Sequence, residues 1–219
     1  MLVAVVCVLV VAGAQSASQA APAQATQQRP APRRPDLSWA DADALQAKLD
    51  GVAARLREGR AVPALTVTER ELNSYVNLSL AAQLPKGVSD PTIRIANGRL
   101  MARAVVDLAP FRAQVKSPGG WNPLSLLPDV VPVDATARLV DVQDGFASLE
   151  LEEVRLSSIP LPPAVLAQIV AASTKTQSRP EGFDVLAPFR LPYSLRRVRL
   201  APGRANLEFL PPPKGLQGR

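Results

Sequence analysis

The sequence contains no histidine, and its only cysteine is Cys7. Without histidine, the imidazole group is excluded as a general base, a proton shuttle and a metal ligand. Cys7 lies in an apolar N-terminal run, and if that run is cleaved, the mature chain has no thiol for catalysis, disulfides or metal binding. Aromatic residues make up only 4% of the chain and apolar residues 47%, so a core must be built mainly from Val, Leu, Ile and Ala.

Carboxylate pairs are the remaining candidates for chemistry, and they are Asp41 with Asp43, Glu69 with Glu71, and Glu152 with Glu153. The first two pairs fall where helices are expected to begin, and acidic residues there stabilise the helix dipole. The third pair lies in an expected strand, where adjacent side chains point to opposite faces. A hydrolase that uses carboxylates is therefore disfavoured, and the sequence predicts no catalytic residue, no bound metal and no cofactor.

The net charge of +6 comes mainly from arginine, without a long basic run. The longest runs are Arg33-Arg34 and Arg196-Arg197, and neither is interleaved with aromatic residues. No nucleic-acid partner is therefore expected. Outside the cytoplasm, this charge favours contact with anionic lipids or envelope polymers, although solvated surface arginines would give the same composition.

The apolar block at residues 2–14 is typical of the hydrophobic region of a secretory signal. It is shorter than the about 20 residues that a membrane-spanning helix needs. Small residues follow it, and we expect cleavage after Ala20. Because no Lys or Arg precedes the block, either the start codon is misassigned or the block is an atypical anchor. A buried N-terminal strand and a lipoprotein attached at Cys7 are separate alternatives.

The rest of the chain divides by composition. Residues 21–37 are rich in Pro, Ala and Gln without apolar periodicity, which predicts a disordered linker after a signal peptide at residues 1–20. A single domain is expected over residues 38–212, followed by a tail at residues 213–219.

Two helices are expected at the start of this domain. The first covers residues 38–58, with Ser38 as its N-cap and an apolar stripe at spacings of three and four. The second begins at a capping box formed by Thr68 and Glu71. It is expected to end near Leu84, because a proline follows.

The second helix carries an apolar face and a polar border. Asn73 and Asn77 lie one turn apart along this border, where their amides can bond to neighbouring backbone. We expect a structural role for Asn73, worth about 1 kcal/mol. The apolar face is formed by Leu72, Tyr75, Val76 and Leu80.

Three turn-forming dipeptides separate alternating segments, namely Asn97-Gly98, Asp144-Gly145 and Pro202-Gly203. Counting outward from the turns predicts the cross-strand pairs Ile95 with Leu100, Ile93 with Ala102, Val198 with Leu207, and Leu200 with Ala205. In the second hairpin, the alternation changes parity at Glu152-Glu153, which predicts a β-bulge. The predicted fold class is α+β, with a long twisted antiparallel sheet of hairpins curved around helices.

Two further apolar segments join the hairpins. The loop at residues 116–132 contains Trp121, Leu126 and Leu127, and we expect it to pack over the sheet or to form a lip that touches a membrane. A third helix is expected to begin at Pro163 and to present an apolar side formed by Val165, Leu166, Ile169 and Val170.

The stretch "LTVTERELNSYVN", then a strand–Asn-Gly–strand unit, then "VRLSSIPLPPAVLAQIV", resembles bacterial envelope proteins of the TULIP-like lipid-binding superfamily. The resemblance is greatest to mycobacterial-type periplasmic phospholipid-binding proteins and related small lipoproteins. It covers about residues 65–210, and the first helix has no counterpart. The matching positions are Thr68, Glu71, Leu72, Asn73 and Ile159-Pro160-Leu161-Pro162.

This resemblance implies a helix inside a curved antiparallel sheet, with lipid in the trough between them. On that basis we expect a non-enzymatic lipid-binding or lipid-transfer protein, periplasmic or secreted, that binds lipid or phospholipid and makes peripheral membrane contact. The alternative is an envelope scaffold or partner-binding module with a closed core and no lipid cargo. The expected lipid-binding residues are Leu72, Tyr75, Val76, Leu80, Trp121, Leu126, Leu127, Leu166 and Ile169.

Overall fold

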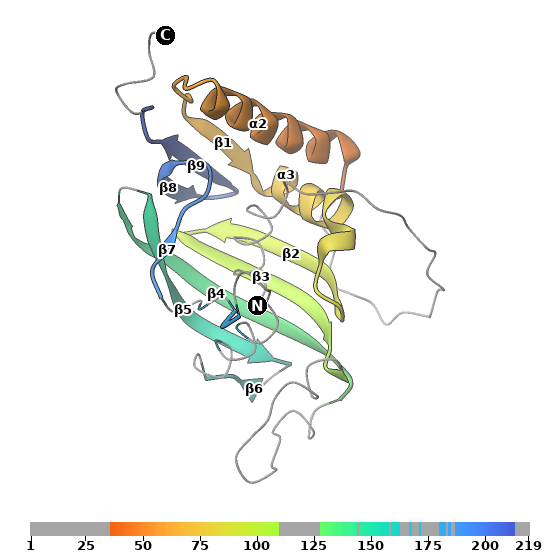
Figure 1. The fold of residues 1–219 in the computed structure, drawn as a ribbon. Helices are drawn as coiled ribbons and strands as arrows, with labels where there is room; N and C mark the ends of the chain where they lie inside the picture. Colours follow the sequence, from red (N-terminus) through yellow and green to blue (C-terminus); the bar gives the residue numbers. More distant parts are fainter. Residues whose placement is uncertain are drawn as a thin grey trace.

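Helices packed against two antiparallel sheets define an α+β fold (Figure 1), which confirms the predicted fold class. The structure is a computed structural model, and it describes residues 36–109, 128–143, 145–157, 159–162, 180–182 and 187–212, with the single positions 167, 171 and 184. The predicted signal peptide, nearly all of the predicted linker and the predicted tail lie outside the described residues.

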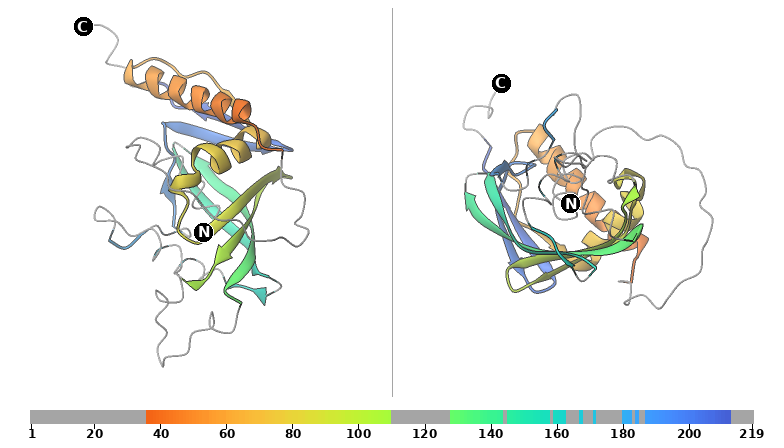
Figure 2. Two further views of the ribbon diagram at one scale, coloured as in Figure 1. Left: turned by 90° about the vertical axis from the view of Figure 1, so that its right-hand side faces the viewer. Right: turned by 90° about the horizontal axis from the view of Figure 1, so that it is seen from below.

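Helix α2 spans Trp39–Arg57, as its apolar stripe predicts. Ser38 is the N-cap, and its hydroxyl accepts a hydrogen bond from the Asp41 N–H at 3.5 Å. Gly59, with a φ of 65°, takes the left-handed conformation that terminates many helices. At one end of the molecule, α2 packs on α3 and the π-helix that follows it (Figures 1 and 2).

The predicted second helix is shorter and less regular than expected. A short strand, β1 (Leu65–Thr68), leads into α3 (Glu69–Ser74), a π-helix η1 (Tyr75–Ser79) and a 3₁₀ turn η2 (Ala81–Gln83). The prediction of one regular helix is therefore wrong, but its start at the capping box and its end near Leu84 are confirmed.

The π-helix begins where a side chain binds a backbone carbonyl of the preceding turn. The Asn77 side chain donates to the carbonyl oxygen of Asn73 at 2.9 Å. In an α-helix that carbonyl would accept the N–H of Asn77. The wider turn is completed by the Leu80 N–H, which donates to the Tyr75 carbonyl at 3.0 Å.

The larger sheet has the strand order β2-β3-β4-β5-β6, and β7 also pairs with β5. Its long strands curve strongly (Figure 2). The sheet confirms the predicted pairing of Ile95 with Leu100 and of Ile93 with Ala102. The strands are β2 (Val88–Ala96), β3 (Arg99–Asp107), β4 (Val130–Gln143), β5 (Phe146–Leu156), β6 (Ile159–Pro160) and β7 (Phe189–Arg190).

The second hairpin contains the predicted bulge. Thr136 pairs with Glu153, whereas Ala137 pairs with Leu151, so that Glu152 is the extra residue of β5. The strand β4 also begins earlier than expected. The loop predicted at residues 116–132 includes Val130 and Val131, but both belong to β4. The ladder between β3 and β4 continues until Val130 pairs with Asp107, the last residue of β3.

The third hairpin does not join the larger sheet. Its strands, β8 (Leu195–Ala201) and β9 (Arg204–Phe209), form a three-stranded sheet with β1, in the order β1-β9-β8. The predicted pairs Val198 with Leu207 and Leu200 with Ala205 are confirmed. Strand β1 has only four residues, too few to show a clear alternation in the sequence.

One aliphatic cluster joins the helices to one face of the larger sheet. Leu45 of α2 and Tyr75 and Leu80 of the second helical segment contribute to it. The strands contribute side chains from β2 to β5, of which the buried ones are Val88, Ala102, Ala104, Val106, Val131, Ala135, Ala137, Leu149, Val154 and Leu156.

Candidate functional site

The most distinctive polar contacts join helix α3 to strand β2, which is the strand at one edge of the larger sheet. The Asn73 side chain binds both backbone groups of Ile93: Oδ1 accepts from the N–H, and Nδ2 donates to the carbonyl, each at 2.7 Å. Nδ2 also donates to the Glu69 carbonyl at 2.8 Å. The Glu69 carboxylate accepts from the N–H of Ile95 at 2.9 Å.

A third side chain continues the series. Asn77 Nδ2 donates to the carbonyl of Pro91 at 2.7 Å. Four residues of helix rise about 6 Å, close to the advance of about 7 Å over two residues of strand. Side chains four apart on the helix therefore meet backbone groups two apart on the strand. We call this set the α3–β2 ladder: Glu69, Asn73 and Asn77 with Ile95, Ile93 and Pro91.

The α3–β2 ladder closes an edge of the sheet. An exposed edge strand offers unpaired N–H and C=O groups to other strands, and covering those groups prevents such pairing. The backbone of Gly203 contributes as well: its N–H donates to the Ile95 carbonyl, and its carbonyl accepts from the Glu69 N–H, each at 2.8 Å. The ladder thus gives Asn73 a structural role that reaches another element and not only the nearby helix backbone.

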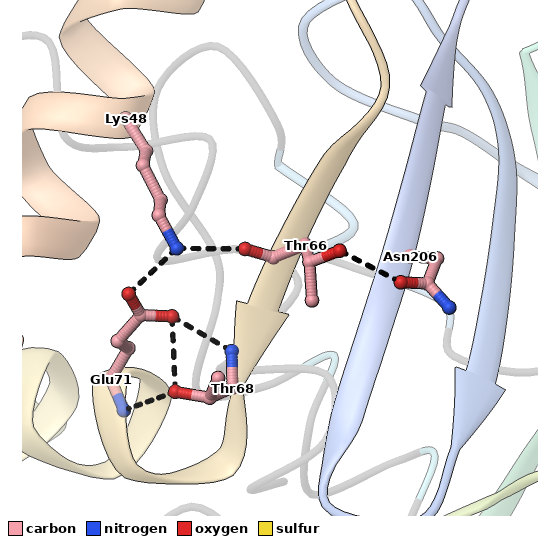
Figure 3. Close-up of polar contacts among 5 residues, drawn as sticks. All are labelled: Lys48, Thr66, Thr68, Glu71 and Asn206. Carbon is pink, nitrogen blue, oxygen red and sulfur yellow. Dashed lines mark hydrogen bonds and ion pairs between the residues drawn. The ribbon is translucent and has the colours of Figure 1, made fainter.

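A second polar cluster holds together α2, β1 and α3 (Figure 3). Lys48 of α2 donates to the Glu71 carboxylate at 2.6 Å and to the Thr66 carbonyl at 2.8 Å. Glu71 also accepts from the N–H of Thr68 at 2.8 Å and from its hydroxyl at 3.0 Å. The Thr66 hydroxyl in turn donates to Asn206 of β9 at 2.9 Å, which extends the contacts into the smaller sheet.

The environment of Glu71 keeps this carboxyl group ionised. Burial raises the pKa of Glu71, but the hydrogen bonds from Lys48 and Thr68 outweigh it and hold the pKa below its ordinary value. The carboxylate is therefore committed to the capping box and to Lys48, which is the arrangement of a structural ion pair.

The described members of the predicted lipid-binding set lie on α3, on η1 and at its end. Tyr75, Val76 and Leu80 are buried, with exposed fractions of 5%, 2% and 3%. Leu72 is half-buried against the main cluster. Burial also raises the pKa of Tyr75. The other predicted members lie outside the described residues, and they are Trp121, Leu126, Leu127, Leu166 and Ile169.

The glutamate pair of the bulge binds arginine and does not form an acid–base pair. Glu152 accepts from both Arg99 and Arg138, and these hydrogen bonds lower its pKa. Glu153 accepts from Arg155 at 2.6 Å. The two carboxylates thus face different guanidinium groups.

The carboxylate of Asp41, at the start of α2, is also bound in an ion pair. Asp41 lies in the first turn of the helix and pairs with Arg70 at 3.1 Å. Across the described part of the chain, no group of three or more Asp or Glu side chains is arranged to hold a metal ion.

Lys48 and Glu69 are the site residues that sequence reasoning missed. The spacing of Glu69, Asn73 and Asn77, each four apart, was the available signal for the ladder. That spacing does not predict that β2 is the strand whose backbone these side chains bind. For Lys48 there was no comparable signal, because it lies 23 residues from Glu71.

Comparison of the chain with protein-family models, with curated proteins and with solved structures found no match. The resemblance to the TULIP-like superfamily stays a prediction from the sequence. Among the described helices, none is both long enough and apolar enough to cross a membrane.

Proposed function

We propose that this protein is a non-enzymatic lipid-binding or lipid-transfer protein of the bacterial envelope, periplasmic or secreted. Acyl chains would lie between the larger sheet and the segment formed by α3 and η1. The observation that carries the proposal is the aliphatic face that runs across four strands, from Val88 on β2 to Leu156 on β5, and meets Tyr75 and Leu80.

The composition of this face suits acyl chains. Burial of one methylene contributes about 0.8 kcal/mol, so a chain of about 16 carbons gains roughly 10 kcal/mol before the costs of ordering. Aliphatic walls supply that gain without any polar anchor. Four alanines, Ala102, Ala104, Ala135 and Ala137, lie on the central strands of this face, where their small side chains take up little volume.

A second candidate function is an envelope scaffold or partner-binding module with a closed core. It is favoured by the burial of Tyr75, Val76 and Leu80, which are at most 5% exposed, as in an ordinary protein core. In that case the aliphatic face is filled by the protein itself.

Native mass spectrometry of the purified protein, followed by solvent extraction, separates the two functions. A lipid-binding protein retains an added mass that extraction removes and identifies as lipid. A protein with a closed core shows the mass of the polypeptide alone and takes up no fluorescent fatty acid when one is added. That pair of results would overturn the proposal.

A further inference from the structure

Positive charge is concentrated on the hairpin formed by β8 and β9. Residues 195–209 contain four arginines and one glutamate, a net charge of +3. Strand β5, by contrast, contains three glutamates and one arginine. We call the first group the arginine face; it consists of Arg196, Arg197, Arg199 and Arg204, all of which are exposed.

The pairing of the strands places most of these arginines on one side of the smaller sheet. Arg199 pairs with Asn206, which pairs with Thr66 of β1. Residues that are paired across strands share a face, and alternate residues point the other way. The opposite side carries Val198 and Leu207, which pack into the core. The side with Arg199 is therefore the outer side of the sheet.

The charge of the arginine face is only partly neutralised. Glu208 lies 4.0 Å from Arg197 and 3.5 Å from Arg199, both long distances for an ion pair. Arg196 and Arg204 form no ion pair with any residue that the structure describes. On the larger sheet, by comparison, guanidinium groups bind carboxylates through short contacts, as at Arg155 and Glu153 (2.6 Å).

We propose that the arginine face docks the protein on membranes that contain anionic phospholipids. Guanidinium groups bind phosphate oxygens through paired, charge-assisted hydrogen bonds. A sheet that presents several arginines on one side can meet several headgroups at once, and each basic residue near an anionic surface strengthens binding by roughly fivefold. This docking does not require acyl chains to enter the core.

The strands that carry this face do not form a nucleic-acid platform. Among the described residues of β1, β8 and β9, the side chains beside the arginines are Thr66, Thr68, Asn206 and Glu208, and none of them has an aromatic ring to stack on bases. Single-stranded nucleic acids are usually bound by such rings together with basic residues. Phosphate headgroups need only the charge and the hydrogen-bond donors.

The test is co-sedimentation of the full chain with vesicles of phosphatidylcholine, with and without phosphatidylglycerol, at low and high salt. We expect extra binding to the anionic vesicles that falls as salt rises. The double variant Arg199→Glu and Arg204→Glu should lose this extra binding by at least about tenfold. The variant with lysine at both positions should keep most of it, because the charge remains.

A matched control is the double variant Arg94→Glu and Arg155→Glu, which makes the same change in net charge on the larger sheet. Its binding should fall less than about threefold if the arginine face is the docking surface. If both double variants lost vesicle binding equally, the proposal would be overturned. It would also be overturned if the wild-type protein bound equally well to vesicles with and without phosphatidylglycerol. Binding to duplex DNA without binding to anionic vesicles would also overturn it.

Circular dichroism shows whether the double variant at Arg199 and Arg204 is folded. If it is unfolded, the single variants Arg199→Ala and Arg204→Ala are used in the vesicle-binding test instead. Docking and cargo are measured separately. An arginine-face variant that no longer binds vesicles should still show the added lipid mass in native mass spectrometry. Conversely, a protein that carries no lipid cargo can still bind anionic vesicles.

Discussion

The carboxamide of Asn73 binds Ile93 as a neighbouring strand would, accepting from its N–H and donating to its carbonyl, each at 2.7 Å. A side chain thus replaces a peptide group at the edge of the sheet. Asn73 is 2% exposed, so this replacement takes place inside the protein, where water cannot substitute for it.

Asn73→Ala should destabilise the protein by roughly 2–4 kcal/mol, because it leaves two buried backbone groups of Ile93 unpaired. This exceeds the value of about 1 kcal/mol expected for one ordinary hydrogen bond. Chemical denaturation measures the difference, and Ser79→Ala, at an exposed position of η1, is the matched control. A loss no larger than that of the control would contradict the structural role of the ladder.

Glu71→Gln should reduce stability at neutral pH by roughly 1–3 kcal/mol, since it removes a charged hydrogen-bond acceptor. The folded-state pKa of Glu71 lies below its ordinary value of 4.5, so the carboxylate stabilises the fold above that pH. The difference between wild type and variant should therefore shrink as pH falls below 4.5. Denaturation at a series of pH values tests this, with Glu58→Gln in an exposed ion pair as control.

Enlarging Ala137 should distinguish a lipid-filled trough from a closed core. Ala137 is fully buried on the aliphatic face. If acyl chains occupy this side of the sheet, Ala137→Leu displaces lipid and changes the melting temperature little. If protein atoms fill the space, overpacking costs typically about 1–3 kcal/mol and no lipid mass is lost. Thr136→Leu, on the other face of the same strand, controls for the added bulk.

A chain that begins at Asp36 should melt cooperatively and at the same temperature as a chain that begins at residue 21. The expectation rests on the lack of apolar periodicity between residues 21 and 36. Differential scanning calorimetry of the two chains makes the comparison. Aggregation or a large drop in melting temperature would mean that the N-terminal residues pack on the domain.

Replacing Trp121, Leu126 and Leu127 together by Ser should reduce liposome binding or lipid transfer strongly if their loop is a membrane-contacting lip. Stability should then fall far less than the roughly 2–5 kcal/mol expected for each large side chain removed from a core. Liposome flotation and thermal melts give the two readings. An unfolded variant would support a loop packed over the sheet, and unchanged liposome binding would exclude the loop from membrane contact.

Features that depend on neighbouring residues could be predicted from the sequence. The capping box at Thr68 and Glu71 involves only four consecutive positions, and the pair Ile95 with Leu100 follows from a tight turn. The bulge at Glu152 was visible because a strand alternates with period two, so one extra residue changes the parity. Short-range geometry determines each of these features, whatever the rest of the chain does.

The tertiary structure decided which segments meet. Thr66 binds Asn206 across 140 positions of the chain, and this contact belongs to a second sheet that alternation alone did not separate from the first. Asn73 binds Ile93 because β2 packs beside α3. The spacing of polar residues in the sequence does not specify that these two elements are neighbours. Hydrophobic attraction has no direction, so many similar aliphatic faces compete as partners. Only the packing of the whole domain, with all buried polar groups satisfied at once, selects among them.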